Sequence, residues 1–162
     1  MAAPSPRRGG RTGAESAPRA ALGLDRPLLI GHDMDPDAVT LRNFDAPEDD
    51  FAWSMGRYAE VEFTADGAGP LRLLLDIDVF RAPPVLTGQN VLVYVNGLRL
   101  HSAFVTGRSM LEIPMGAGVL QPAGNTLVFD LPDAIRPLEF GMDDGRMLGV
   151  KLFSLTLEPG DG

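Results

Sequence analysis

Few segments of this sequence combine residue types at the spacing that catalysis requires. Residues 107–111 (GRSML) come nearest to a nucleophile elbow, but leucine stands where the motif requires its second glycine. His101 and Ser102 are neighbours, and neighbouring residues of a strand point to opposite faces. A catalytic triad is therefore not indicated. A hydrolase stays open as a third reading, which substitution of Asp76 or Ser109 would test.

Two carboxylates have a spacing that glycoside hydrolysis could use. Asp76 and Asp78 fall in an expected strand and would share one face, roughly 7 Å apart at a rise of about 3.3 Å per residue. A carboxylate pair of this kind can serve as acid and base or nucleophile. The interpretation favoured here is a solvent-facing or ion-paired strand edge, which requires no chemistry.

The sequence offers little for a metal or a cofactor. Asp33, Asp35 and Asp37 have the spacing that opens a calcium loop, but Ala38 stands where glycine is needed and Phe44 where the bidentate glutamate belongs. The chain has no cysteine and two histidines, and it contains no glycine-rich phosphate loop. We therefore expect no metal site and no cofactor.

Charge divides the 162-residue chain into two parts. Residues 1–26 hold five basic and two acidic side chains, whereas residues 27–162 hold nine basic and twenty acidic ones. The two sums, +3 and −11, return the net charge of −8. We expect residues 1–26 to form an extended basic arm, because a segment rich in proline, glycine and alanine buries too little apolar surface to fold alone. Its arginines are Arg7, Arg8, Arg11, Arg19 and Arg26.

Residues 27–52 are interpreted as an acidic extended linker with one or two short strands. Short apolar patches alternate there with acids and prolines, so the segment could lie along its own domain or across a neighbouring subunit. The arm lacks the apolar region of a secretory signal, and no run of about 18 apolar residues predicts a membrane span.

From residue 53 onward the sequence shows the period-two alternation of half-buried strands. Asn96-Gly97 lies between two such runs and favours a two-residue hairpin, because both residues tolerate a positive φ. A helical turn is compatible with Asp133–Phe140. Strands are expected at Arg57–Thr64, Leu71–Phe80, Asn90–Val95, Leu98–Thr106, Ser109–Pro114, Thr126–Leu131 and Leu148–Glu158.

This pattern predicts an all-β fold. Seven or eight strands within about 110 residues, with no spacing for helical crossovers, are typical of a two-layer antiparallel sandwich. A jelly roll is the variant we expect, over residues 53–158 and preceded by the extended N-terminal arm.

Several short motifs resemble a known family. They are Trp53-Ser54 with Gly56, Phe80 at the end of a long strand, the hairpin at Val93–Gly97, Asn125-Thr126-Leu127, Pro137, Gly141 and the closing residues 144–150 (DGRMLGV). Together they resemble a jelly-roll domain found with bacterial polysaccharide glycosyltransferases and surface proteins. The resemblance covers about residues 53–158 and implies a sandwich of carbohydrate-binding type without a catalytic centre of its own. A copy that carries a basic arm is similar to a head spike of a phage-like particle such as a gene transfer agent.

Sugar binding requires aromatic rings for the apolar faces of a pyranose and planar polar groups for its hydroxyls. Tyr94 and Arg99 flank the expected hairpin and would share a face if its turn has two residues. Each candidate also has a purely structural interpretation, such as a core position for Trp53 and a solvated strand edge for Arg99 and His101. The candidate carbohydrate-binding residues are Trp53, Tyr58, Tyr94, Arg99, His101 and Phe104.

Asp144 and Arg146 are interpreted as a structural pair. They lie between two expected strands, where a carboxylate and a guanidinium can hold a loop through bidentate hydrogen bonds. Ligand contact by these two residues is the less favoured reading.

The sequence thus predicts a non-enzymatic structural or adhesion component of a phage-like particle. The arm would dock into other protein subunits of a large assembly, the chain itself would form a homo-oligomer, and the sandwich would bind a surface polysaccharide. The alternative is a carbohydrate-binding accessory domain of bacterial polysaccharide synthesis or export. The expected location is a virion-like particle, or the bacterial cytoplasm before assembly. Nucleic-acid binding by the acidic body is disfavoured, because attraction to phosphate dominates such affinity.

Overall fold

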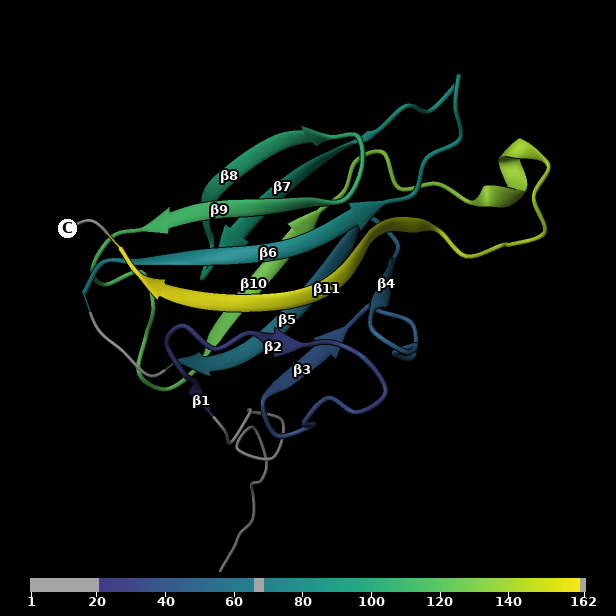
Figure 1. The fold of residues 1–162 in the computed structure, drawn as a ribbon. Coiled ribbons are helices and arrows are strands. Elements are labelled where there is room, and N and C mark those ends of the chain that lie inside the picture. Colours follow the sequence, from purple (N-terminus) through teal and green to yellow (C-terminus); the bar gives the residue numbers. More distant parts are fainter. Residues whose placement is uncertain (1–20, 66–68, 161–162) are drawn as a thin grey trace, which may run out of the picture.

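The computed structural model describes residues 21–65 and 69–160, which form two β-sheets packed face to face (Figure 1). The seven strands expected after residue 56 are each found within one or two residues of their expected bounds, and the expected helical turn is a 3₁₀ helix at Pro137–Phe140. The strands are β1 Ala21–Leu22, β2 Leu28–Leu29, β3 Val39–Arg42, β4 Ala52–Met55, β5 Tyr58–Ala65, β6 Leu71–Val79, β7 Gln89–Val95, β8 Leu98–Val105, β9 Ser109–Met115, β10 Asn125–Asp130 and β11 Leu148–Pro159.

The order of the strands is that of a jelly roll. One sheet runs β1-β5-β10-β7-β8 with β3 also paired to β5, and the other runs β2-β11-β6-β9 with β4 also paired to β11. Strands β4 to β11 therefore divide into the orders β4-β11-β6-β9 and β5-β10-β7-β8, so that the chain passes repeatedly between the two layers. The predicted fold class, an all-β two-layer jelly-roll sandwich, is confirmed.

The core lies between the sheets and follows the alternation of β6. Leu73, Leu75 and Ile77 are fully buried, and the intervening side chains face outward. Strand β11 pairs with β6 along nearly its whole length, but a bulge between Leu152 and Ser154 moves its inward positions by one residue. The bulge keeps both halves of this twelve-residue strand apolar on the core side.

The β7–β8 hairpin has the two-residue turn that Asn96-Gly97 predicts. Asn96 has φ 50° and Gly97 has φ 85°, and Val95 pairs directly with Leu98. A second irregularity follows in β8, where Tyr94 pairs with Arg99 but Val93 pairs with His101. Because of this bulge, Arg99 faces outward and His101 faces the core side of the sheet, although they are two residues apart.

Residues 27–52, expected as a linker, contribute strands to both sheets. Strand β3 pairs with β5, whereas β2 and β4 pair with β11. Ile30, Val39 and Ala52 are buried in the core, so this segment packs along its own domain. Figure 1 shows β1 to β4 on the side of the sandwich opposite β8 and β9.

Most of the expected basic arm lies outside the described residues. Arg7, Arg8, Arg11 and Arg19 fall in residues 1–20, and Arg26 is exposed in the turn that follows β1. Docking of this segment into an assembly of other subunits therefore stays a prediction.

A buried asparagine joins the β7–β8 turn to the loop before β10. The side-chain oxygen of Asn125 accepts hydrogen bonds from the backbone N–H of Gln121 at 2.7 Å and from the side-chain amide of Asn96 at 2.9 Å. Asn96 also donates to the carbonyl of Val119 and accepts from the backbone N–H of Thr126. Because Asn125 is 2% exposed, water cannot readily replace these partners.

We predict that Asn125→Ala lowers the free energy of unfolding by about 2–3 kcal/mol, because unsatisfied buried polar groups cost about 1–3 kcal/mol each. Urea denaturation measures this change. Gln121→Ala is the matched control, because Gln121 takes part in the network through its backbone and its side chain is exposed. A loss of stability of equal size in both variants would contradict the assignment to the Asn125 side chain.

Candidate functional site

The outer face of β5, β10 and β7 carries two tyrosines on a diagonal. Tyr58 of β5 is opposite Asp130 of β10, and Tyr94 of β7 is opposite Val128 of the same strand. The alternate residues of these strands, such as Phe129, are fully buried between the sheets. Burial of the inner positions therefore forces both tyrosines to face outward.

These residues surround a shallow hollow of about 330 Å³. It is lined by Tyr58, Tyr94, Gly97, Val128 and Asp130. Gly97 belongs to the β7–β8 turn, so the network around Asn125 also supports one wall of the hollow. The lining thus combines two phenol rings, an apolar floor and one carboxylate.

An ion pair borders the hollow. Nε of Arg57 donates to Oδ1 of Asp130 at 2.9 Å, and this hydrogen bond raises the pKa of Arg57 above its usual value. The guanidinium carbon of Arg57 also lies 5.2 Å from the centroid of the Tyr58 ring. The side chain of Asp130 is 12% exposed and that of Arg57 is 55% exposed. The carboxylate is therefore fixed in the sheet, whereas the guanidinium reaches into solvent.

The chemistry of this arrangement is recognition of a small polar molecule. Aromatic rings cover apolar C–H surface, while a fixed carboxylate and a guanidinium offer an acceptor and several donors. Asp130 is held by Arg57 and can offer its second carboxylate oxygen to a ligand as a hydrogen-bond acceptor.

The sequence-predicted residues Tyr58 and Tyr94 meet in this hollow, and three others lie around it at different distances. Arg99 is exposed and pairs with Tyr94. His101 pairs with the buried Val93 and therefore lies on the core side of the sheet. Phe104 is exposed on β8 but pairs with Asn90, at the far end of β7 from the turn. None of the three lines the hollow.

Trp53 belongs to the other sheet. It lies on β4, where it packs against a small buried cluster that includes Phe80 and Leu148. Nζ of Lys151 lies 5.5 Å from the Trp53 ring and 4.0 Å from the ring of Phe51. A cation of the protein therefore lies against these aromatic rings, and Trp53 is not part of the hollow.

Sequence reasoning missed Arg57 and Asp130. Arg57 directly precedes β5 and Asp130 is the last residue of β10, and their positions in the sequence give no sign that they meet across 73 residues. Alternation along the strand could place Asp130 on an outer face, but it could not identify Arg57 as its partner.

The candidate hydrolytic residues are engaged in structural contacts. Asp76 receives two hydrogen bonds from Arg108 at 3.0 and 3.1 Å, and the guanidinium carbon of Arg108 lies 3.7 Å from the Phe153 ring centroid. Asp78 accepts from the backbone N–H of Val79. The hydroxyl of Ser109 donates to the carbonyl of Gly107. These contacts match the reading of Asp76 as an ion-paired strand residue.

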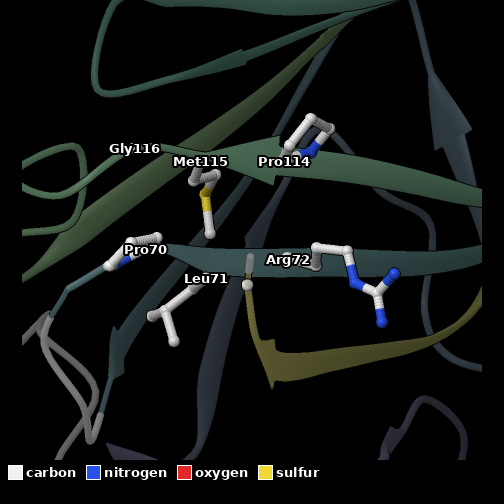
Figure 2. A pocket seen from close by; sticks show the side chains of 7 residues that line it. Pro70, Leu71, Arg72, Pro114, Met115 and Gly116 are labelled. Atoms are coloured by element: carbon white, nitrogen blue, oxygen red, sulfur yellow. The ribbon is translucent and has the colours of Figure 1, made fainter. Parts of the chain in front are cut away.

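Figure 2 shows a second hollow, of about 220 Å³, between the start of β6 and the end of β9. Leu71 and Met115 line it and are almost fully buried, and the Arg72 side chain points away from Pro70. Arg72 is held by Glu158 at 2.7 Å. This hollow lacks the combination of rings and polar groups found on the other sheet.

A third hollow, also of about 220 Å³, includes Asp33 of the calcium-like spacing together with Asp49 and Asp50. Asp35 accepts a hydrogen bond from the backbone N–H of Asp37, as in an ordinary turn. Within residues 21–65 and 69–160 no three His, Cys, Asp or Glu side chains are grouped as metal binding requires.

Asp144 and Arg146 form the ion pair that their spacing predicts. Arg146 donates from Nε and Nη2 to Asp144, the shortest bond being 2.7 Å, and from Nη1 to Asp45 at 2.7 Å. The loop before β11 is thereby tied to the segment before β4. These hydrogen bonds from Arg146 lower the pKa of Asp144 to about 2 and also lower that of Asp45.

Comparisons with known proteins give distant structural likenesses. No protein-family model matches the chain, and no curated protein matches its sequence. A CBM35 module from Paenibacillus barcinonensis is similar with a TM-score of 0.48 and 10% identity, over 83% of this chain and 99% of that one. The CBM36-1 domain of a multidomain xylanase from the hindgut metagenome of Trinervitermes trinervoides gives 0.45 and 13%, over 85% and 98%.

A family two carbohydrate esterase from Clostridium thermocellum, in complex with cellohexaose, gives a TM-score of 0.42 and 14% identity. The likeness covers 73% of this chain but spans 30% of the esterase chain. At these values the functional argument rests on the site alone. Among the described residues, no helix is both long and apolar enough to cross a membrane.

We predict that the Asp144 carboxyl titrates with a midpoint near pH 2, as measured by carboxyl-carbon NMR. Because its pKa is lower in the folded than in the unfolded chain, the ion pair stabilises the loop fully above about pH 4. That stabilisation is lost as the pH falls toward 2. Arg146→Gln should return the midpoint toward 4, whereas Arg136→Gln, an exposed arginine of the same connection, should leave it unchanged. A wild-type midpoint near 4 would contradict the pairing.

Proposed function

We propose that this chain is a non-catalytic carbohydrate-binding module that holds a sugar on the outer face of β5, β10 and β7. The observation that carries the proposal is the hollow flanked by Tyr58 and Tyr94 and bordered by the Arg57–Asp130 pair. It matches the two needs of sugar recognition, which are flat apolar surface and fixed hydrogen-bonding groups.

The shape of the site favours binding over chemistry. A hollow of about 330 Å³ on an open sheet leaves one side of a ligand in water, and it suits one or a few units of a longer chain. Catalysis gains from enclosure, because charged groups act more strongly where water is excluded. An open hollow with an ion-paired carboxylate is suited to holding a glycan.

Of the two functions that the sequence predicts, the site supports the carbohydrate-binding accessory domain best. The jelly roll and the outward tyrosines serve that role without any further partner. A structural role in a phage-like particle depends on residues 1–26, of which residues 1–20 lie outside the described structure. The particle, its oligomeric state and its location therefore stay predictions.

We predict that Tyr58→Ala and Tyr94→Ala each weaken polysaccharide binding at least tenfold, because each removes a ring that covers the sugar. Affinity gel electrophoresis against soluble glucans, xylans, mannans and galactans measures the retardation. Tenfold corresponds to about 1.4 kcal/mol, within the range of aromatic contacts.

Phe104→Ala is the matched control, since it removes a ring that is 55% exposed on the same sheet but outside the hollow. It should retain wild-type retardation, and all three variants should keep the wild-type melting temperature. Retardation that survives both tyrosine substitutions would rule out this face as the binding site.

A further inference from the structure

The ion pair at the hollow has unused hydrogen-bonding capacity. Nε of Arg57 occupies Oδ1 of Asp130, and no other described side chain or backbone group binds Oδ2 or the two Nη groups. An ionised carboxylate accepts at both oxygens, and a guanidinium carries five N–H donors. One free acceptor on the fixed carboxylate therefore lies beside the free donors of the guanidinium.

This combination matches two adjacent hydroxyl groups of one sugar ring. Neighbouring hydroxyl oxygens of a pyranose lie about 3 Å apart, which is also the usual length of the hydrogen bonds that they form. One hydroxyl can donate to Oδ2 of Asp130 while the next accepts from an Nη group of Arg57. Asp130 lines the hollow together with Tyr58 and Tyr94, and the Arg57 guanidinium lies 5.2 Å from the Tyr58 ring centroid, so one sugar can reach the ion pair and the tyrosines together.

The charge of the site decides between neutral and charged sugars. Arg57 and Asp130 cancel, since their charges are in contact, and the chain as a whole carries −8. Glu60, on β5 opposite Val128, adds a carboxylate to the same face. Its Oε1 lies 3.8 Å from Nη1 of Arg42, which makes a shorter contact of 2.7 Å with Glu62. A charged sugar therefore gains no net attraction from the Arg57–Asp130 pair, and a sugar carboxylate also meets the carboxylate of Glu60.

Arg99 does not reverse this balance. It lies on the edge strand β8 opposite Tyr94 and is exposed, so water weakens its attraction for a ligand charge. Its effect is also screened at ordinary ionic strength.

We infer that the ligand is an uncharged sugar unit that presents two adjacent free hydroxyls to Asp130 and Arg57. This inference rests on the proposed function, whose site it specifies. It excludes glycans in which either hydroxyl is methylated, acetylated or part of a linkage at the bound unit.

The test uses NMR titration of the full chain with methyl glycosides of glucose, mannose, galactose, xylose and arabinose. For the glycoside that binds most tightly, each hydroxyl is then replaced by hydrogen in turn. We expect affinity to fall at least tenfold at two adjacent positions and less than threefold at the others. A uniform loss at all positions, or a large loss at one position alone, would overturn the inference.

Two variants assign the effect to the ion pair. Arg57→Lys keeps the charge but removes the fork of donors, and Asp130→Asn replaces the ion-paired carboxylate by an amide. In each variant, the deoxy glycoside that lacks the hydroxyl facing the changed side chain should bind within threefold of the native glycoside. Arg42→Lys is the matched control, because Arg42 of the neighbouring strand β3 forms the same kind of ion pair with Glu62 of β5. It should preserve the wild-type preference.

Charge selectivity is tested with glucuronate and galacturonate oligosaccharides against their methyl esters. We expect the ester to bind at least as tightly as the acid, with less than a twofold change in affinity between 50 and 500 mM NaCl. Acid forms that bind tenfold more tightly than their esters would overturn the inference while leaving sugar binding intact.

The failure of the proposed function has a different signature. If no glycoside or polysaccharide perturbs the signals of Tyr58 and Tyr94, the carbohydrate-binding proposal itself fails. If the tyrosine substitutions abolish binding but the hydroxyl pattern is uniform, only the inference about adjacent hydroxyls fails.

Discussion

The interaction on which the rest of this structure depends is the apolar contact between the two sheets. Leu73, Leu75 and Ile77 of β6 and the inward residues of β10 and β7 are removed from water together, which is the main favourable term in folding. Because side chains of a strand alternate, burying one set assigns the opposite face to the other set. A slip of one residue in β5 or β7 would turn Tyr58 or Tyr94 into the core.

The two outer faces of the sandwich differ in what covers them. On the face of β11 and β6, Lys151 lies against Phe51, and Arg108 lies over Phe153 while binding Asp76. Those aromatic rings are thus already in contact with cations of the protein. On the face of β5, β10 and β7, Arg57 also lies 5.2 Å from the Tyr58 ring centroid, but there the Tyr58 and Tyr94 rings border an open hollow together with Asp130. The hollow with its fixed carboxylate, and not the number of aromatic residues, singles out this face for ligand binding.

The Arg57–Asp130 pair also gives the site its chemical character. It holds the carboxylate in one orientation, so that an acceptor is presented to a ligand without rearrangement. It also cancels the charges of both groups, so the polar part of the site acts through directional hydrogen bonds. A preorganised neutral pair beside aromatic rings suits reversible recognition of hydroxyl groups better than proton transfer or attraction of ions.

The sequence by itself determined the local features of this protein. Alternation predicted the later strands, because each strand needs only its own pattern of burial, and Asn96-Gly97 predicted the hairpin that pairs Tyr94 with Arg99. Strands β1 to β4 have two to four residues, too few for alternation to mark, and they form because β5 and β11 offer edges to them. The bulge in β11 likewise depends on its partner β6.

Only the tertiary structure decided the site. Strand β10 inserts between β5 and β7, although it follows both in the chain, and this insertion brings Tyr58 and Tyr94 to one hollow. It also brings Asp130 to Arg57 across 73 residues. Such contacts depend on the order of the strands within a sheet. That order is determined by how the two apolar faces pack together, and the local sequence around Arg57 or Asp130 does not encode it.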